Sequence, residues 1–236
     1  MLNAATPREK PARFITRKAV VVVAILAIAA AIVGLVRTRQ TSDQAGDEAA
    51  WWKFDGASGL LGSVHGQPRW TGGKLGKALQ VDGLSGFVSG AKVDGLPQRN
   101  APRTLAVWIK PEANLIDDSG IFHYGAVWPG PPGRSFSLAL TRLGKISLGS
   151  LIASSSVESS NSVADGAWRH VAGTWDGSAA SIYIDGKLDT RRQPQVKPDT
   201  GDSSGWAIGR YLREGTPFRG AIDDVRVYSR ALKTRR

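Results

Sequence analysis

The chain has 236 residues and a formal net charge of +11, with 42% hydrophobic residues, 28 glycines, 12 prolines and no cysteine. This length and apolar content are enough for one sizeable domain and an additional segment. The absence of cysteine excludes disulfide bonds, thiolate metal sites and a cysteine nucleophile.

The positive charge does not mark a nucleic-acid site. Residues 1–39 contain seven Lys or Arg and one Glu, so more than half of the charge excess lies in this segment. The remaining basic residues are scattered among acids, without interleaved aromatic residues. We therefore expect a solvated surface and no nucleic-acid partner.

The N-terminal segment contains a long apolar run at residues 19–36, AVVVVAILAIAAAIVGLV. At ~1.5 Å per residue a helix of this length spans roughly 27 Å, close to the ~30 Å hydrocarbon core of a bilayer. A cleaved signal peptide is the competing interpretation, but the run is longer than a usual signal-peptide core and its small residues lie inside it. We predict an uncleaved transmembrane signal anchor.

Basic residues precede this run more densely than they follow it, so the positive-inside rule keeps residues 1–18 in the cytoplasm. The remaining chain is then periplasmic or extracellular. Residues 37–50 are polar and predict a flexible tether. Since cysteine is absent, a bacterial envelope protein fits better than a eukaryotic secreted one.

From Trp51 to Leu232 the sequence predicts strands separated by turns, followed by a basic tail at 233–236. The clearest pattern is WRHVAGTWDGSAASIYIDGK at 168–187, where two alternating runs flank Asp176-Gly177 and the second ends at Asp185-Gly186. The regular turn spacing favours an all-β fold of two packed antiparallel sheets. Further strands are predicted at 51–54, 78–81, 104–109, 135–140, 145–148, 206–209 and 221–228, and a serine-rich loop at 154–162.

One strand departs from strict alternation. In 221–228, Ile222 and Val225 both read as core residues although alternation puts them on opposite faces. A β-bulge at Asp223-Asp224 reconciles them and turns one carboxylate toward the sheet rim.

Large side chains in the strands have a structural interpretation. We expect Trp108, Trp168 and Trp175 to fill the space between the sheets rather than to stack on a ligand. His170 alternates with strand residues and is expected to be structural rather than catalytic.

Seven phrases occur in a fixed order: WWKFDG (51–56), GGKLGKALQVDG (72–83), TLAVWIKP (104–111), WRHVAGTWDG (168–177), IYIDGK (182–187), AIGR (207–210) and FRGAIDDVRVYSRAL (218–232). In wording and order they resemble the laminin-G-like, concanavalin-A-like jelly rolls. The resemblance implies a jelly-roll sandwich over residues 51–232 in which the first and last strands pair. It does not cover residues 1–50.

The resemblance also implies a metal. In related jelly rolls the acids at the positions of Asp55 and Asp223 often lie near a calcium ion. Calcium needs roughly six to eight oxygen ligands, which two carboxylates and loop carbonyls can supply. The alternative is that both aspartates cap turns and strand ends.

We expect no enzyme activity. Jelly-roll glycosidases need two carboxylates flanking the scissile bond, often on one strand as Glu-x-Asp-x-x-Glu, and the glutamates after the anchor do not form such a cluster. Nucleophile-elbow and phosphate-binding glycine fingerprints are missing as well.

A binding surface is the remaining expectation, and the resemblance implies sugars, glycans or proteins as partners. The candidate ligand loop is YGAVWPGPPGR (124–134), where Tyr124 and above all Trp128 lie among Pro and Gly residues, with Tyr211 and Arg213 as additions from a second loop. The alternative for Trp128 is that it folds back as a lid on the sandwich. The leading hypothesis is a membrane-anchored, non-catalytic module that recognises carbohydrate. The alternative is a structural or signalling module that docks on another envelope protein.

Overall fold

The computed structural model describes residues 47–56, 62–113, 117–126, 131–150, 155–201, 205–211 and 215–233. These residues form two packed sheets. The front sheet contains β1 (Glu48–Trp52), β3 (Arg69–Gly72), β4 (Lys77–Asp82), β6 (Arg103–Pro111), β11 (Arg169–Trp175), β12 (Ala180–Ile184), β13 (Lys187–Arg192) and β16 (Arg219–Tyr228). The back sheet contains β2 (Ser63–His65), β5 (Phe87–Gly90), β7 (Ser119–Gly125), β8 (Ser135–Leu140), β9 (Lys145–Gly149), β10 (Ser156–Ser162), β14 (Trp206–Ile208) and β15 (Thr216–Pro217).

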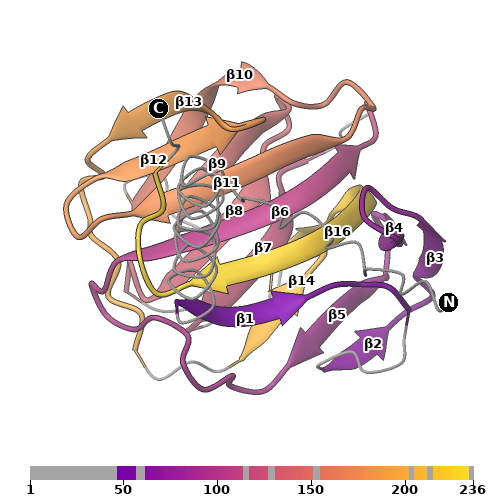
Figure 1. Ribbon diagram of the computed structural model, residues 1–236, viewed down its shortest axis with the longest axis horizontal. Helices are drawn as coiled ribbons and strands as arrows, with labels where there is room; N and C mark the ends of the chain where they lie inside the picture. The colour runs from indigo at the N-terminus through magenta and orange to yellow at the C-terminus, as the bar shows by residue number, and fades with distance from the viewer. Residues whose placement is uncertain are drawn as a thin grey trace, which may run out of the picture. The chain divides into compact units, whose positions relative to one another are not determined.

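The two sheets lie one behind the other in Figure 1, with the front sheet nearer the viewer. Its strand order is β13-β12-β11-β6-β16-β4-β3, and β1 also pairs with β16. The back sheet has the order β10-β9-β8-β7-β14-β5-β2, with β15 added parallel to β7. All other pairs are antiparallel, which confirms the predicted sandwich.

The core lies between the sheets and is built from alternate residues of both. Trp52 of the front sheet packs on Trp206 and Phe122 of the back sheet, with ring centroids 4.7 and 5.4 Å apart. Trp175 is also fully buried. Each large ring removes about 150–250 Å² from water, so these aromatic residues supply much of the burial that stabilises a fold without disulfides.

The predicted hairpin is present. β11 and β12 pair from Trp175↔Ala180 to Val171↔Ile184. Asp176 Oδ1 accepts the amides of Ser178 and Ala179 at 2.9 and 2.8 Å, which fixes the first turn. Asp185 and Gly186 have φ of 49° and 75°, the left-handed pair that a two-residue hairpin turn requires.

The domain begins three residues before the predicted boundary at Trp51. Residues 48–50, predicted as part of the tether, belong to β1, which pairs with β16 from Glu48↔Tyr228 to Trp52↔Val225. The pairing of first and last strands is therefore confirmed, but the boundary was wrong. The sequence Glu-Ala-Ala has no alternation of its own, so the partner strand fixes its conformation.

The serine-rich loop prediction was also wrong. β10 occupies 156–162 and pairs with β9, and Val157 is buried. The alternation of apolar and polar residues that marks a strand is missing here because serines stand at buried positions. Their hydroxyls make buried hydrogen bonds: Ser159 Oγ accepts the amide of Ile146 at 2.9 Å.

Arg103 is a fully buried cation. Its guanidinium uses all five N–H groups: Nε donates to Ala101 O, Nη1 to Tyr124 Oη and Thr200 Oγ1, and Nη2 to Gln98 O and Arg99 O. It ties β6 to the preceding loop and to the segment before β14. Oxygen dipoles, rather than a carboxylate, compensate its charge in these described contacts.

The predicted cytoplasmic segment 1–18, anchor 19–36 and most of the tether lie outside the described residues. Across the described ranges, no helix is long and apolar enough to cross a bilayer.

Candidate functional site

Tyr124 is not a surface ligand residue, contrary to the sequence prediction. It belongs to β7 and is 1% exposed. Its hydroxyl donates to Pro97 O at 3.0 Å and accepts from Arg103 at 2.8 Å. Burial raises the pKa of this phenol to about 12. β7 continues to Gly125, one residue beyond the point where the Gly- and Pro-rich sequence suggested a loop.

Tyr211 is likewise buried, at 9% exposure, with its ring edge-on to His123 at 6.0 Å. Burial raises its pKa, and the charges of Asp118 and Asp117 add to this shift. Its ring is therefore a packing element rather than an exposed platform, which corrects the second prediction. Trp128 and Arg213 lie outside the described residues.

Asp55 and Asp223 both bind the loop between β3 and β4. Asp223 Oδ2 accepts the Leu75 amide at 2.8 Å, and Asp55 Oδ1 accepts the Lys77 amide at 3.1 Å. A Cβ on Gly73 or Gly76 would come within 2.6 Å of Asp223 Oδ2 or 2.1 Å of Asp55 Oδ1. Glycine is needed at both positions because the carboxylates approach the loop backbone so closely.

These contacts make both aspartates turn-capping groups, the alternative that the sequence left open. One feature also fits a cation: Asp223 Oδ1 is buried without a hydrogen-bond partner in the described structure, and burial raises the pKa of this carboxyl. Among the described residues, however, no group of three or more His, Asp or Glu side chains is arranged to hold a metal. The donor set on these residues is thus two carboxylates, short of what calcium needs without backbone oxygens and water.

The predicted β-bulge is present at Asp223-Asp224. The register of β16 with β6 shifts between Asp223 and Arg226, and Asp224 has φ of 51°. Ile222 and Val225 are both buried, at 0% and 1% exposure. The extra residue restores the inward direction of Val225 and leaves Asp224 on the outer face beside Arg226.

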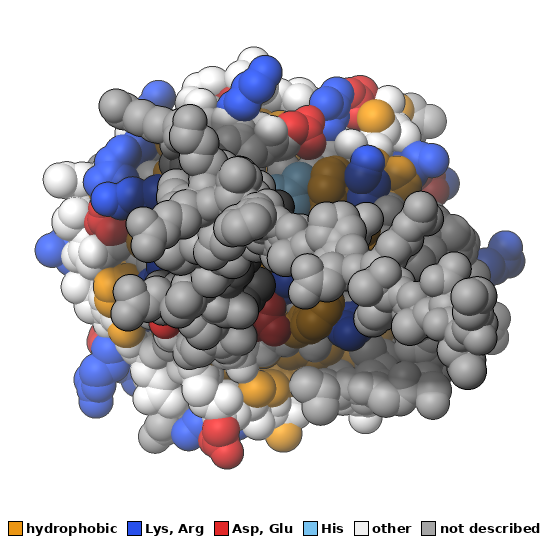
Figure 2. All heavy atoms as spheres, in the orientation of Figure 1, with side chains coloured by type: hydrophobic (Ala, Val, Ile, Leu, Met, Phe, Trp, Pro, Cys, Tyr) orange, Lys and Arg blue, Asp and Glu red, His pale blue; other side chains and the backbone are white. Residues whose placement is uncertain are grey.

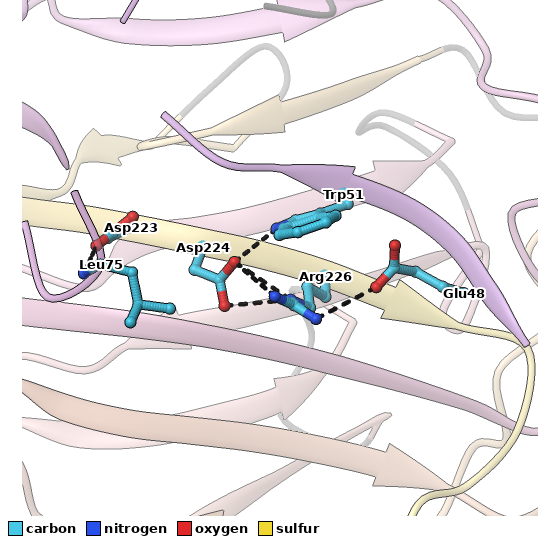
Figure 3. Close-up of polar contacts among 6 residues, drawn as sticks. All are labelled: Glu48, Trp51, Leu75, Asp223, Asp224 and Arg226. Atoms are coloured by element: carbon cyan, nitrogen blue, oxygen red, sulfur yellow. Dashed lines mark hydrogen bonds and ion pairs between the residues drawn. The ribbon is translucent and has the colours of Figure 1, made fainter. Parts of the chain in front are cut away.

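Asp224 is the centre of a polar network on that face (Figure 3). It accepts Trp51 Nε1 at 2.5 Å and both Arg226 Nε and Nη2 at about 3.1 Å. Arg226 Nη1 lies 3.5 Å from Glu48, and its guanidinium lies 4.0 Å from the Trp51 ring centroid. These contacts hold Arg226 on the outer face of the sheet, with Nε and Nη2 bound to Asp224 and Nη1 to Glu48.

The outer face of the front sheet carries a groove over two alanines. The ladders place Trp51, Arg226, Ala106, Ala172 and Tyr183 in one row across β1, β16, β6, β11 and β12. The small methyl groups leave a depression of about 280 Å³, called the alanine groove, whose described lining also includes Thr104, His170, Thr174, Tyr228 and Asp224. Aromatic rings therefore stand around an apolar floor.

Trp108 and His170 form a ridge beside this groove. Their ring centroids are 5.0 Å apart, and Lys74 Nζ lies 4.7 Å above the Trp108 ring. Trp108 is half-buried on the outer face, not in the core as predicted. Burial lowers the pKa of His170, so the imidazole is held neutral.

A second groove lies on the other side of the ridge. Trp168, predicted as a core residue, is half-buried and lines it together with Lys110, Ala221, Gln80 and Thr71. This Trp168 groove has a volume of about 620 Å³ and is more polar than the alanine groove. The face drawn in Figure 2 shows the same mixture, with hydrophobic side chains and a histidine in its central part and Lys and Arg side chains around them.

Sequence reasoning missed both grooves because it looked for ligand residues in loops. The available signal was the identity of the outward-facing residues of the strands. Ala106, Ala172 and Ala221 stand where larger polar residues usually cover a sheet, between outward-facing Trp and Tyr residues. Reading this signal requires the strand register, which alternation alone does not give.

The fold and site define a two-sheet β-sandwich whose front sheet carries two grooves, one of them rimmed by aromatic residues, on its outer face. Residues 85–235 match the family model Laminin_G_3, described as the concanavalin A-like lectin/glucanases superfamily, and the chain belongs to this family. No curated protein sequence matches the chain significantly.

Several solved structures share the fold. Domain 4 of AbnA, an extracellular arabinanase from Geobacillus stearothermophilus solved with arabinotriose, is 24% identical with a TM-score of 0.61, over 80% of this chain and 95% of that one. The binding domain of Paraclostridial Mosquitocidal Protein 1 is 14% identical (TM-score 0.63, 80% of this chain). Botulinum neurotoxin type C, whose cell entry depends on two ganglioside molecules, is 14% identical (TM-score 0.59, 82% of this chain). The chain spans about half the length of each of these two toxin chains.

Proposed function

We propose that this protein is a non-catalytic, membrane-anchored module that binds carbohydrate along the outer face of its front sheet. The observation that carries the proposal is the pair of grooves on that face: the alanine groove has aromatic residues around Ala106 and Ala172, and the Trp168 groove has one tryptophan beside Ala221. Sugar rings present flat C–H faces that stack on aromatic side chains, and their hydroxyls need hydrogen-bonding groups at the rim. In the alanine groove, Tyr183 and Tyr228 supply the rings for stacking. In the Trp168 groove, Trp168 supplies the ring and Gln80 supplies the hydrogen-bonding group.

The fit of the grooves supports an extended ligand. Adjacent strands lie about 4.8 Å apart, so a row of five strands is roughly 19 Å long, enough for a short oligosaccharide. The ridge of Trp108 and His170 separates the grooves, so a glycan chain that crosses it contacts both. The solved relatives named with arabinotriose and gangliosides agree with a carbohydrate ligand for this fold.

The charges in the grooves support a non-catalytic role. Glycoside hydrolysis needs two carboxylates free to exchange protons or attack the sugar. The described acids that line the two grooves are Asp224, held by Arg226 and Trp51, and Glu112, whose Oε2 is 2.6 Å from Arg219 Nε. Both carboxylates are paired with an arginine, which favours a binding role over a catalytic one.

Anchoring remains part of the proposal on the grounds of the sequence. The apolar run at 19–36 and the basic residues before it favour a single-pass protein whose sandwich lies outside the cytoplasmic membrane. Protease protection of spheroplasts tests this: cleavage of the sandwich by added protease in intact spheroplasts supports the topology, and full protection until lysis contradicts it.

Calcium binding is a further part of the proposal. The Oδ1 of Asp223, which has no hydrogen-bond partner among the described residues, supports a cation held between Asp223 and Asp55 with loop carbonyls and water. Isothermal titration with CaCl2 after chelator treatment tests it, with Asp223→Asn as the variant. Heat of binding that the variant lacks supports the site, whereas no heat in the wild type removes calcium from the proposal.

The glycan proposal is tested on the full-length chain in a non-glycosidic detergent, because alkyl maltosides carry a sugar headgroup. A polysaccharide array identifies binders, and Trp168→Ala and Tyr183→Ala are compared with Leu143→Ala, which truncates an exposed side chain outside both grooves. We expect either groove variant to lose at least about tenfold in affinity, since stacking on one ring contributes about 0.5–1.5 kcal/mol beyond its buried area. A blank array contradicts carbohydrate binding and leaves docking on an envelope protein as the explanation for the open face.

A further inference from the structure

One row of the front sheet carries basic side chains at both ends. The ladders join Arg69 of β3, Gln80 of β4, Ala221 of β16 and Lys110 of β6. Three strand spacings of about 4.8 Å put the backbone positions of the two basic residues roughly 14 Å apart along the row. Between them the ladder places Gln80 and Ala221, which carry no charge.

The same row connects two cavities. Lys110, Gln80 and Ala221 line the Trp168 groove, and Arg69 and Gln80 line a neighbouring cavity of about 330 Å³. Gln80 and Glu112 line both, so the two cavities meet at these side chains. A ligand lying along the row therefore passes Trp168 and Lys110 at one end and Arg69 at the other.

Most described arginines of the domain form an ion pair with an acid, and the two basic residues of this row differ from them in this respect. Arg169, Arg191, Arg226 and Arg230 each lie within 3.5 Å of an acid. Arg69 and Lys110 are exposed, and in the described part of the chain neither forms an ion pair. The two nearby acids are already engaged: Glu112 binds Arg219, and Asp82 Oδ1 accepts the amides of Leu84 and Ser85.

We infer that the Trp168 groove and the adjoining cavity select polysaccharides built from uronic acids. This inference rests on the proposed carbohydrate function and names its ligand class. Trp168 stacks on a sugar ring, Gln80 bonds hydroxyls, and Lys110 and Arg69 pair with carboxylates of residues some 14 Å apart on one chain. A polymer with repeated carboxylates meets both cations at once, whereas a neutral glycan leaves them in water.

Polymers matched except for charge test this inference. The full-length chain in non-glycosidic detergent is titrated with polygalacturonate, alginate and hyaluronan, and with the carboxyl-reduced form of each, in which –COO⁻ has become –CH2OH. We expect at least one uronate polymer to bind about tenfold or more tightly than its reduced form. This preference decreases between 50 and 500 mM NaCl, because exposed charges are screened.

The variant Arg69→Gln/Lys110→Gln removes both cations, and Arg192→Gln/Lys197→Gln removes two exposed cations elsewhere on the domain as the matched control. We expect only the first variant to lose the preference for the uronate polymer while it keeps the wild-type urea midpoint. Equal binding of charged and reduced polymers overturns the inference but leaves the proposed function intact, and so does binding of the reduced forms alone. A preference that survives in Arg69→Gln/Lys110→Gln overturns the assigned site. Binding to no polysaccharide at all overturns the proposed function together with the inference.

Discussion

Asp224 and Arg226 stand two residues apart on one strand, and their side chains form a paired contact in which Nε and Nη2 each lie 3.1 Å from a carboxylate oxygen. The bulge at Asp223-Asp224 makes this contact possible, because without the extra residue Val225 would leave the core or Arg226 would enter it. The pair connects the first and last strands, since Asp224 also accepts the Trp51 indole N–H. It thus joins two strands whose contacting residues are more than 170 positions apart in the chain.

Substitution of Asp224 by Ala is expected to lower the free energy of unfolding by about 2 kcal/mol. It leaves the Trp51 N–H without its acceptor and removes the nearest carboxylate from a partly buried guanidinium, whose other acid partner, Glu48, lies 3.5 Å away. Urea denaturation followed by tryptophan fluorescence measures the loss. Glu112→Ala is the control: its ion pair with Arg219 is 44% exposed on both sides, and we expect no more than about 1 kcal/mol. Equal losses in both variants contradict a special role for the Asp224 network.

Lysine is not expected to replace Arg103. The guanidinium uses five N–H donors in a buried site, and an ammonium group offers three from a single point. At least two of the oxygens on Gln98, Arg99, Ala101, Tyr124 and Thr200 then lose their donor, at a cost of roughly 2–4 kcal/mol in unfolding free energy. Thermal denaturation of Arg103→Lys checks this. A variant with wild-type stability shows that water reaches the site and substitutes for the missing donors.

Gly173 is required by the distance between the sheets. A Cβ there would lie 2.4 Å from Leu148 Cδ1 and 2.9 Å from Cδ2 of the back sheet. Because Leu148 is fully buried, we expect Gly173→Ala to cost about 1–3 kcal/mol through overpacking.

A double-mutant cycle with Leu148→Val isolates this clash. The shorter side chain makes room for the new methyl, so the double variant should lose less stability than the sum of the single variants. Additive losses would place the cost of Gly173→Ala in the backbone of β11 rather than in the contact with Leu148.

Stability is expected to fall with acid below neutral pH because of His123. Burial lowers the pKa of this imidazole from 6.5 to about 4, so the unfolded chain binds a proton in this window that the folded protein does not. The stabilisation is therefore present above pH 6.5 and is lost as the pH falls toward 4, by up to about 3 kcal/mol at 1.4 kcal/mol per pH unit. His170, whose pKa burial also lowers, adds in the same direction.

Urea denaturation at half-unit intervals from pH 7 to 4.5 measures this dependence. His123→Leu should have a shallower slope than the wild type, with the His170 contribution retained. An unchanged slope in His123→Leu shows that His123 is protonated in the folded state or that other groups cause the acid sensitivity.

The sequence by itself determined the β class, the β11–β12 hairpin, the Asp-Gly turns at 176–177 and 185–186, and the bulge in β16. These features depend on local patterns: alternation, Asp-Gly turn chemistry, and the conflict between Ile222 and Val225. The pairing of the first and last strands, and the expectation that Asp55 and Asp223 lie near one calcium ion, came only from the family resemblance. That both aspartates bind the loop between β3 and β4 is known only from the tertiary structure.

Only the tertiary structure decided which face of the front sheet each side chain occupies. Alternation shows that Trp108, Ala106 and Trp168 share a face with their neighbours two residues away, but an aromatic residue looks the same in sequence whether it faces the core or solvent. The direction is set by the register across strands that are far apart in the chain, such as Ala172↔Ala106 and Arg226↔Ala106. That register brings Ala106 and Ala172 into one row and Ala221 into another, on the two sides of the row of Trp108 and His170, and so creates the two grooves. The same packing carries Tyr124 and Tyr211 into the interior.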